Sequence, residues 1–377
     1  MQTNTPLNRN KTINILGTRG YPAAHGGFET FAARLAPYLR DRGWSVNIYC
    51  QIDPHEGKPI PDYEDDLDGI HRIHLHGFGK GSIGSIAFDA RCAFDALKRP
   101  GMDLVLGYNT AIFNVLQRLY GRTVIMNMDG IEWKRAKWSN LIKAWFYANE
   151  FVGYCTSSVP IADHPEIANH LHRHGWKRSV MIPYGADSIT NASDLAVRSM
   201  GLEPRKYVIS IARIEPENSL LEIVRSFSLK PRGLALVILG NLQNSNPYHR
   251  AVCAAASDEV IFVGAIYERE KLASLRFHAL AYLHGHQVGG TNPSLVEALG
   301  AGSAIIAQDN KFNRWVAGDE QTYFADEKSL GTIFETVLAD TDYLSRASGA
   351  SRERHRTEFT WDDVLGKYET LFDKFLD

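Results

Sequence analysis

The chain has 377 residues, of which 44% are hydrophobic and 22% charged, and this length predicts two domains of ordinary size. Its 41 Lys and Arg against 43 Asp and Glu give a formal net charge of −2, which argues against nucleic acid as a main partner. No apolar run reaches the roughly 18 residues of a membrane span, and residues 1–11 lack the apolar core of a signal sequence. The four cysteines are scattered without metal-ligand or disulfide spacing, so we expect a reduced, cytoplasmic protein without a metal.

In the first half, short apolar runs alternate with longer segments of helical period, which is typical of parallel strands joined by crossover helices. The pattern predicts strands near 12–17, 45–50, 103–107, 122–127, 152–156 and 179–182. It predicts helices near 27–41, 84–98, 111–119, 136–150 and 163–174, and a small hairpin or extended insertion at 63–77.

A Gly-rich turn joins the first expected strand to the first helix, and Gly26 and Gly27 stand at its end. A phosphate could rest on the backbone amides of this helix start. The glycine spacing is neither that of the dinucleotide-binding fingerprint nor that of a P-loop. A simple tight turn is the alternative interpretation.

Two acidic residues, Asp129 and Glu132, follow the expected strand at 122–127. At the carboxyl end of a strand, either could bind acceptor hydroxyls or act as a general base. A turn aspartate before Gly130 is the alternative for Asp129.

Residues 133–146 mix basic and aromatic side chains. Trp138, Leu141, Ile142 and Trp145 form an apolar stripe at helical spacing. The segment could lie on an anionic membrane surface and receive a lipid-linked acceptor. Alternatively, it is an amphipathic helix packed on the core of its domain.

In the second half, the pattern predicts strands near 206–212, 234–239, 259–263, 279–283 and 303–307. It predicts helices near 218–228, 248–256, 267–277, 293–301, 327–339 and 341–356. We expect a first domain at 1–186, a linker at 187–204, a second domain at 205–358, and a helix at 359–377 that packs on the first domain.

The second Gly-rich stretch, residues 285–300, follows an expected buried strand and opens a helix. Asn292 stands at the N-cap and Pro293 at the first helical position, so we expect the Ser294 and Leu295 amides to point out unpaired. Free amides at the positive end of a helix bind anions, and Glu297 one turn further could take hydroxyls. An anion beside a polyol is what a nucleotide-sugar presents. A capped helix after a Gly-rich turn is the alternative.

These features together resemble glycosyltransferase family 4, whose GT-B fold has two Rossmann-like doubly wound domains facing across a cleft. The resemblance covers nearly the whole chain and is carried by residues 26–30, 39–46, 212–215 and 298–307. Residues 127–135, 215–218 and 289–297 are similar to the bacterial rhamnosyltransferases of cell-surface polysaccharide assembly.

The resemblance implies a retaining glycosyltransferase that moves a sugar, L-rhamnose from dTDP-L-rhamnose, to a saccharide or lipid-linked acceptor. No metal cofactor is expected, and the departing phosphate could itself take the acceptor proton. The expected catalytic residues are Asp129, Glu132 and His286. The expected donor-binding residues are Gly26, Gly27, Arg213, Asn218, Gly289, Gly290, Thr291, Asn292, Ser294, Leu295 and Glu297. For Arg213, an ion pair with Glu215 or Glu217 is the alternative to phosphate binding.

Four positions depart from the family pattern. The family has paired glutamates with seven residues between them, but the first position is Gly289 here, and His286 or Gln287 could cover its role. The lysine about six residues beyond the phosphate-binding arginine is Ser219 here. Asp129 stands where the family has a histidine, and His164 follows an aspartate where a serine is usual.

Two other functions are compatible with these departures. One is a GT-B-shaped sugar-nucleotide epimerase, which would need no acceptor. The other is a non-catalytic carbohydrate-binding protein, which the missing glutamate and lysine would explain.

Overall fold

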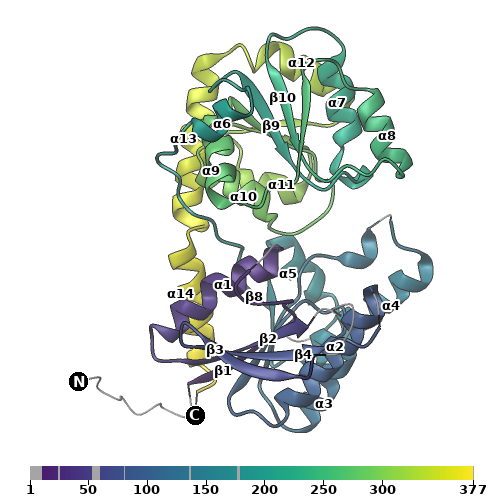
Figure 1. The fold of residues 1–377 in the computed structure, drawn as a ribbon, viewed down its shortest axis with the longest axis vertical. Helices are drawn as coiled ribbons and strands as arrows, with labels where there is room; N and C mark the ends of the chain where they lie inside the picture. The colour runs from purple at the N-terminus through teal and green to yellow at the C-terminus, as the bar shows by residue number, and fades with distance from the viewer. Residues whose placement is uncertain are drawn as a thin grey trace. The chain divides into compact units, whose positions relative to one another are not determined.

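The computed structural model describes residues 11–23, 26–52, 60–79, 81–135, 137–175 and 179–376. The chain divides into two compact units: unit 1 is Met1–Pro183 with Asp362–Asp377, and unit 2 is Tyr184–Trp361. Each unit contains its own sheet of mainly parallel strands (Figure 1). The predicted fold class of two Rossmann-like α/β domains is confirmed.

The sheet of unit 1 has eight strands in the order β3-β4-β2-β1-β5-β6-β7-β8. The antiparallel pair β3 and β4 forms a hairpin at the expected place, and the other neighbours pair in parallel. The strands are β1 (Thr12–Leu16), β2 (Ser45–Ile52), β3 (Tyr63–Leu67), β4 (Ile70–His76), β5 (Met102–Leu106), β6 (Val124–Asn127), β7 (Val159–Ala162) and β8 (Val180–Met181).

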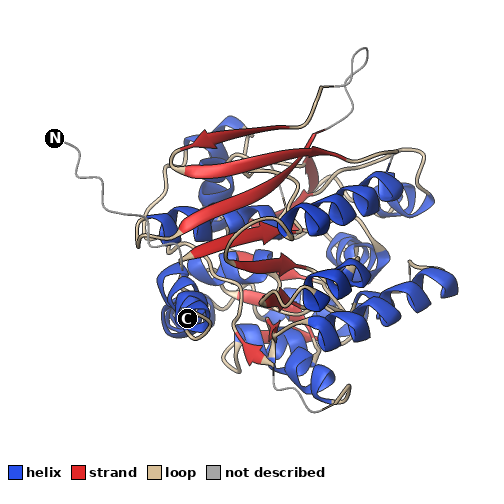
Figure 2. Ribbon diagram, turned by 90° about the horizontal axis from the view of Figure 1, so that it is seen from below, coloured by secondary structure: helices blue, strands red, loops and turns tan. Residues whose placement is uncertain are grey.

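Helices flank the strands (Figure 2) because parallel strands are joined by crossovers that cover the sheet. Those of unit 1 are α1 (Gly27–Arg40), α2 (Gly81–Ala96), η1 (Ala111–Phe113), α3 (Asn114–Leu119), η2 (Glu132–Lys134), α4 (Asn140–Thr156) and α5 (Pro165–His172). The last helix, α14 (Trp361–Asp373), packs on α1 and β6: Tyr368 lies 4.7 Å from the Phe31 ring, and its hydroxyl accepts a hydrogen bond from Asn127.

The expected strand at 152–156 is wrong, because these residues are the last turns of α4. Asn149, Glu150, Gly153 and Tyr154 form one continuous buried helical face. A short apolar run does not by itself separate a strand from a buried helix, and no stop signal interrupts this one. The strand next to β6 in the sheet is β7, which the sequence pattern did not indicate.

Unit 2 has a parallel sheet of six strands in the order β11-β10-β9-β12-β13-β14. The strands are β9 (Tyr207–Ile211), β10 (Ala235–Leu239), β11 (Val260–Gly264), β12 (Ala281–His284), β13 (Ile305–Gln308) and β14 (Thr322–Phe324). The helices are α6 (Leu195–Ser199), η3 (Pro216–Asn218), α7 (Leu220–Ser228), α8 (Pro247–Ala254), α9 (Arg269–His278), α10 (Pro293–Gly300), α11 (Lys311–Ala317), α12 (Glu327–Thr336) and α13 (Thr341–Glu358).

Alternate residues along these strands point to opposite faces of the sheet and pack into two separate hydrophobic cores. Tyr207 and Ile209 belong to the core under α9, α10 and α11, whereas Val208 belongs to the core under α7 and α12. Because both faces are buried, the strands are nearly continuous apolar runs, which made them visible in the sequence.

The expected linker at 187–204 instead belongs to unit 2. It contains α6, and Val197 and Leu202 are buried in the core beside Tyr207. These two apolar residues stand in a polar stretch and form no periodic pattern in the sequence. The short elements α11 (Lys311–Ala317) and β14 (Thr322–Phe324) were also missed.

Each sheet has one point where the strand order reverses. In unit 1 the chain builds outward from β1 through β2 and then crosses to β5; in unit 2 it builds from β9 through β10 and β11 and then crosses to β12. Loops that leave neighbouring strands in opposite directions open a crevice at their carboxyl ends, where ligands bind in such sheets.

Candidate active site

The reversal point of unit 2 is formed by the loops after β9 and β12, which touch each other. A Cβ placed on Gly285 would lie 2.1 Å from the Asn218 carbonyl oxygen, so only glycine permits this approach. The Gln287 amide donates to the Glu217 carbonyl at 2.9 Å, and the Gln287 side chain donates to the Ser219 hydroxyl at 3.0 Å. The two loops therefore present one joined surface.

At the start of α10, Asn292 is the N-cap and Pro293 opens the helix, as the sequence indicates. The expectation of two unpaired amides is wrong. The Ser294 amide donates to the Asn292 side chain at 3.0 Å, and the Leu295 amide donates to the Asn292 carbonyl at 3.1 Å. The N-cap residue thus satisfies the donors that it was expected to expose.

The remaining predicted residues of this loop surround that cap. Thr291 is buried, whereas a Cβ on Gly289 would meet no atom within 4 Å. The Ser294 hydroxyl lies 2.6 Å from the Tyr282 hydroxyl and donates to the Ile211 carbonyl at 3.2 Å. The cap is anchored to the ends of β9 and β12, and open space remains beside Gly289, next to Gly290.

The Glu297 carboxylate forms an ion pair with the guanidinium of Arg276, on α9. The Arg276 side chain is only 6% exposed, whereas that of Glu297 is 33% exposed. A buried guanidinium needs a compensating charge, so Glu297 has a structural partner in addition to any ligand. Sequence reasoning missed Arg276, whose position 21 residues earlier gave no local signal.

Arg213 and Asn218 share the loop after β9 but differ in exposure. The Arg213 side chain is 63% exposed and lies 3.5 Å from the Glu215 carboxylate, the pairing given above as the alternative. Asn218 is buried and donates to the Arg213 carbonyl at 2.8 Å. Asn218 therefore shapes the loop, while the Arg213 guanidinium forms an exposed, weak ion pair with Glu215.

Two histidines stack at the end of β12. The His284 and His286 rings lie 4.3 Å apart at an angle of 10°. His284 is fully buried, and neither of its ring nitrogens has a hydrogen-bond partner among the described residues. Burial, and then the neighbouring His286, hold the pKa of His284 well below its usual range, so the ring is neutral.

The reversal point of unit 1 contains a cavity. A cavity of about 830 Å³ opens between the ends of β1 and β5, α2 and the first turns of α4. Its apolar wall includes Phe28, Phe113, Trp138, Leu141, Ile142 and Trp145. The apolar stripe predicted at 138–145 therefore lines a cavity instead of a closed core.

A small polar cluster lies in the wall of this largely apolar cavity. The Asp89 carboxylate accepts a hydrogen bond from the Thr110 hydroxyl at 2.9 Å and lies 3.5 Å from the Arg19 guanidinium. Burial raises the pKa of Asp89, although Arg19 and Thr110 oppose the shift. Sequence reasoning missed this residue; the available signal was an aspartate among the buried positions Phe88, Cys92 and Ala93 of α2.

The Gly26–Gly27 turn stands near this cavity, at the start of α1. The space beside Gly26 is occupied by the Glu29 carboxylate, since a Cβ on Gly26 would lie 2.1 Å from it. The same carboxylate accepts a hydrogen bond from the Arg19 amide at 3.0 Å. This carboxylate bonds to the Arg19 amide and does not cap the helix start. A phosphate would have to displace it.

Asp129 and Glu132 do not line the cavity. Asp129 has φ of 53° and its amide donates to the Asn127 side chain at 2.9 Å, which makes it a left-handed turn residue. One carboxylate oxygen of Glu132 accepts from the Trp138 indole at 2.9 Å, and the other lies 2.7 Å from Arg135. Glu132 therefore holds Trp138 in the cavity wall.

Two family models match the chain. Residues 197–354 match glycosyl transferases group 1, and residues 10–187 match a domain of unknown function, DUF1972. The chain is a glycosyltransferase. Among curated protein sequences, none is significantly similar to it.

Solved structures with a similar fold cover nearly the whole chain. Sucrose-phosphate synthase from Thermosynechococcus elongatus has a TM-score of 0.79 at 16% identity, over 97% of this chain and 99% of that one. Anabaena HepE with UDP and glucose has a TM-score of 0.73 at 16% identity, over 96% and 99%. A trehalose-phosphate synthase from Burkholderia xenovorans with glucose-6-phosphate has a TM-score of 0.73 at 11% identity, over 96% and 100%. These likenesses establish the GT-B fold of this glycosyltransferase.

Proposed function

We propose that the enzyme is a retaining glycosyltransferase that moves a sugar from a nucleoside-diphosphate donor to an acceptor carrying an apolar group, in surface polysaccharide synthesis. The observation that carries the proposal is the largely apolar cavity with a mostly buried aspartate at the reversal point of unit 1. The donor dTDP-L-rhamnose is proposed from the motifs at 127–135, 215–218 and 289–297 alone.

The acceptor side is the cavity of unit 1. Its volume of about 830 Å³ is within the range of small-molecule sites. Indole and aliphatic walls suit the first units of a lipid carrier, and Arg19 and Asp89 suit a polar head with a phosphate or a hydroxyl. This combination favours a lipid-linked acceptor over a free saccharide.

Acceptor deprotonation is assigned to Asp89 or to the departing phosphate. A carboxylate with a raised pKa is a better base than an ordinary one, and Asp89 has that environment inside the cavity. Asp129 and Glu132 stay predictions as acceptor ligands. Both carboxylate oxygens of Glu132 are engaged, by Trp138 and Arg135.

The donor side is the joined loop surface of unit 2. The HepE neighbour holds UDP and glucose, which supports a nucleotide-sugar as the donor here. Arg213 would exchange its exposed contact with Glu215 for diphosphate oxygens, and Glu297 would take ribose hydroxyls while held by Arg276. His286 would stand near the donor sugar in place of the missing glutamate.

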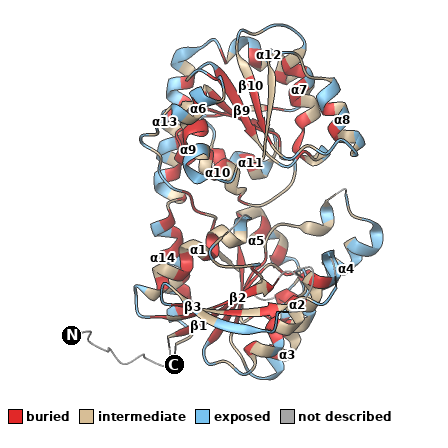
Figure 3. Ribbon diagram, viewed as in Figure 1, coloured by how far each residue is buried: buried red, intermediate tan, exposed pale blue. Residues whose placement is uncertain are grey.

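We also propose that unit 1 docks on an anionic membrane to meet its acceptor. None of the described helices has the length and apolarity needed to cross a bilayer. Much of α4 is exposed (Figure 3), including Leu141 at 82% and Trp145 at 40%. Lys134 and Lys137 are exposed beside this surface, which is the pattern of a peripheral contact.

The test is a panel of nucleotide-sugars, scored first by thermal shift and then by product analysis with a prenyl-diphosphate saccharide and the matching free saccharide. We expect dTDP-L-rhamnose to stabilise the protein and to be consumed only with an acceptor, and faster with the lipid-linked one. Formation of an epimerised sugar from the donor without an acceptor would identify an epimerase. Binding without any transfer or hydrolysis would overturn the proposal.

A further inference from the structure

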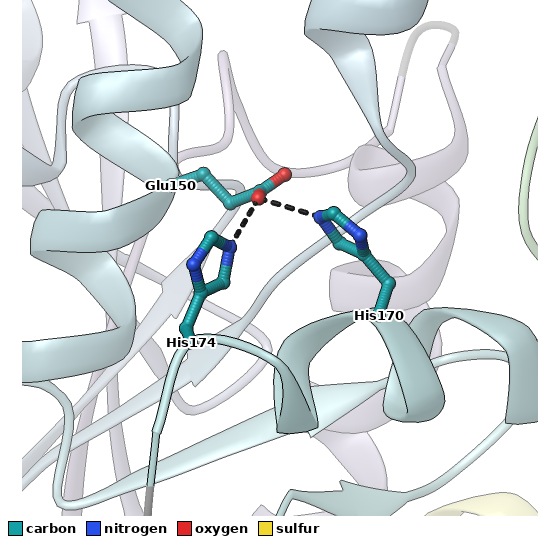
Figure 4. A group of neighbouring side chains, drawn as sticks. All are labelled: Glu150, His170 and His174. Carbon is teal, nitrogen blue, oxygen red and sulfur yellow. Dashed lines mark hydrogen bonds and ion pairs between the residues drawn. The ribbon is translucent and has the colours of Figure 1, made fainter.

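Three side chains of unit 1 converge outside the cavity. Glu150 is on α4, His170 is on α5, and His174 lies just after the end of α5. The turn that ends α5 brings His174 back toward His170, and the two ring centroids lie 5.3 Å apart. Each imidazole Nε2 lies 2.7 Å from the same Glu150 oxygen, Oε1 (Figure 4).

The cluster is nearly closed to solvent. Glu150 is 1% exposed, and the side chains of His170 and His174 are 12% and 8% exposed. Aromatic rings surround it: Trp133 lies 6.0 Å from the His170 ring, and Tyr154 lies 5.8 Å from the His174 ring. A dry surrounding strengthens the attraction between a buried carboxylate and a cation.

The second carboxylate oxygen of Glu150 is fixed separately. Oε2 accepts a hydrogen bond from the Trp133 indole at 3.0 Å. That bond orients the carboxylate and turns Oε1 toward both imidazoles, which is the role that outer-shell groups play around metal ligands. Without a metal, two imidazole N–H groups already satisfy Oε1, so hydrogen bonding alone is the competing explanation.

We propose that Glu150, His170 and His174 form a zinc site. Their three ligand atoms lie within 4.8 Å of one another, and two imidazoles with one carboxylate are a common zinc ligand set. Zinc bonds of about 2.0–2.2 Å require the ligand atoms to separate by only about half an ångström from their present contacts. Water would complete the coordination, and the imidazoles would bind through Nε2 with their protons on Nδ1.

The site would be independent of the proposed sugar transfer. It would join α4 to the end of α5 and, through Trp133, to the loop of Asp129. Leu141 and Trp145, roughly two and a half and one and a half turns before Glu150 on α4, line the cavity. A bound ion would therefore stiffen one wall of the acceptor site.

The test uses untagged full-length protein stripped with a chelator and titrated with zinc by calorimetry and thermal unfolding. We expect one zinc per chain and, at 100 times Kd, a rise of about 5–10 °C in the unfolding midpoint. Glu150→Gln and His174→Gln should lose both effects. His172→Gln is the matched control, since His172 is exposed on the same helix and outside the cluster.

Cobalt makes the test independent of variant folding. Cobalt bound to the wild-type protein should give the visible bands of a low-coordinate nitrogen and oxygen site, and one equivalent of zinc should remove them. No saturable binding to the stripped wild type, or equal binding by Glu150→Gln and the control, would overturn the proposal and leave a hydrogen-bonded carboxylate.

Discussion

The reversal points of the two units are built on the same strand plan but end differently. In unit 1, α2 and α4 leave a cavity of about 830 Å³ whose wall is largely apolar and holds the mostly buried Asp89. In unit 2, the loops after β9 and β12 touch, and their polar groups are paired with each other. The same fold therefore offers a largely apolar cavity in one unit and a polar loop surface in the other. The proposed function needs such a difference: an apolar site for a lipid-linked acceptor and a polar surface for a nucleotide.

The largest expected effect comes from the polar group in the apolar cavity. Asp89→Asn should reduce transfer by a factor of about 100 to 10,000, the range for loss of a general base, with donor affinity unchanged. Steady-state kinetics and calorimetry with the donor measure the two quantities. If Asp129→Asn, in the turn outside the cavity, causes the larger loss, the base belongs to that loop and not to Asp89.

The same variant has a pH signature. The folded-state pKa of Asp89 is raised by burial, so ionisation costs stability as pH rises from its unfolded-state pKa through its folded-state pKa. Asp89→Asn should therefore be more stable than the wild type at neutral pH, with the difference shrinking toward acid pH. Urea unfolding at several pH values measures this difference in stability. A variant less stable than the wild type at neutral pH would contradict a carboxylate whose pKa is raised by desolvation.

Membrane attraction should be confined to unit 1. Replacing Lys134, Lys137 and Lys143 with Gln should weaken binding to anionic vesicles by about 100-fold at low salt, since each base near the surface contributes roughly 1 kcal/mol. The matched control replaces Lys230, Lys271 and Lys328 of unit 2, which are exposed and carry the same total charge. Co-sedimentation is the measurement. Equal losses in both triple variants would make the attraction non-specific, and wild type that never sediments would remove the proposed docking.

The polar surface of unit 2 depends on a buried cation. Glu297→Gln should lower the free energy of unfolding by about 1–3 kcal/mol, because the Arg276 guanidinium is left buried without its charge partner. Glu335→Gln is the control, since its ion pair with Lys230 is about half exposed and should contribute little. Urea unfolding measures both. The variant should also bind nucleotides more weakly but inorganic diphosphate as before; equal losses would place Glu297 in the helix cap alone.

Local rules predicted the parts of the site that depend on neighbours in sequence. Asn292 and Pro293 begin α10 because their backbone preferences and capping chemistry act within one turn. The state of the Ser294 and Leu295 amides was missed, although Asn292 itself is the residue that satisfies them.

Long-range packing decided the rest. Glu297 has a partner on α9, and the cavity is assembled from residues between 16 and 146, so no sequence window contains either. The strand expected at 152–156 became helix because its buried face continues that of Glu150, a residue held from α5 by two histidines. Sequence periodicity records which residues are buried but not which element buries them.

The smallest expected effect is on the exposed cation of unit 2. Arg213→Ala should weaken dTDP or UDP binding about ten-fold, near 1.4 kcal/mol, because a hydrogen bond to a charged group contributes about 1.5–3 kcal/mol. The fold should be unaffected, since the side chain is 63% exposed and contacts Glu215 only weakly. Arg198→Ala is the matched control: its side chain is 60% exposed in the same unit and pairs with Asp194. Calorimetry that gives the same affinity for both variants would place Arg213 outside the donor site.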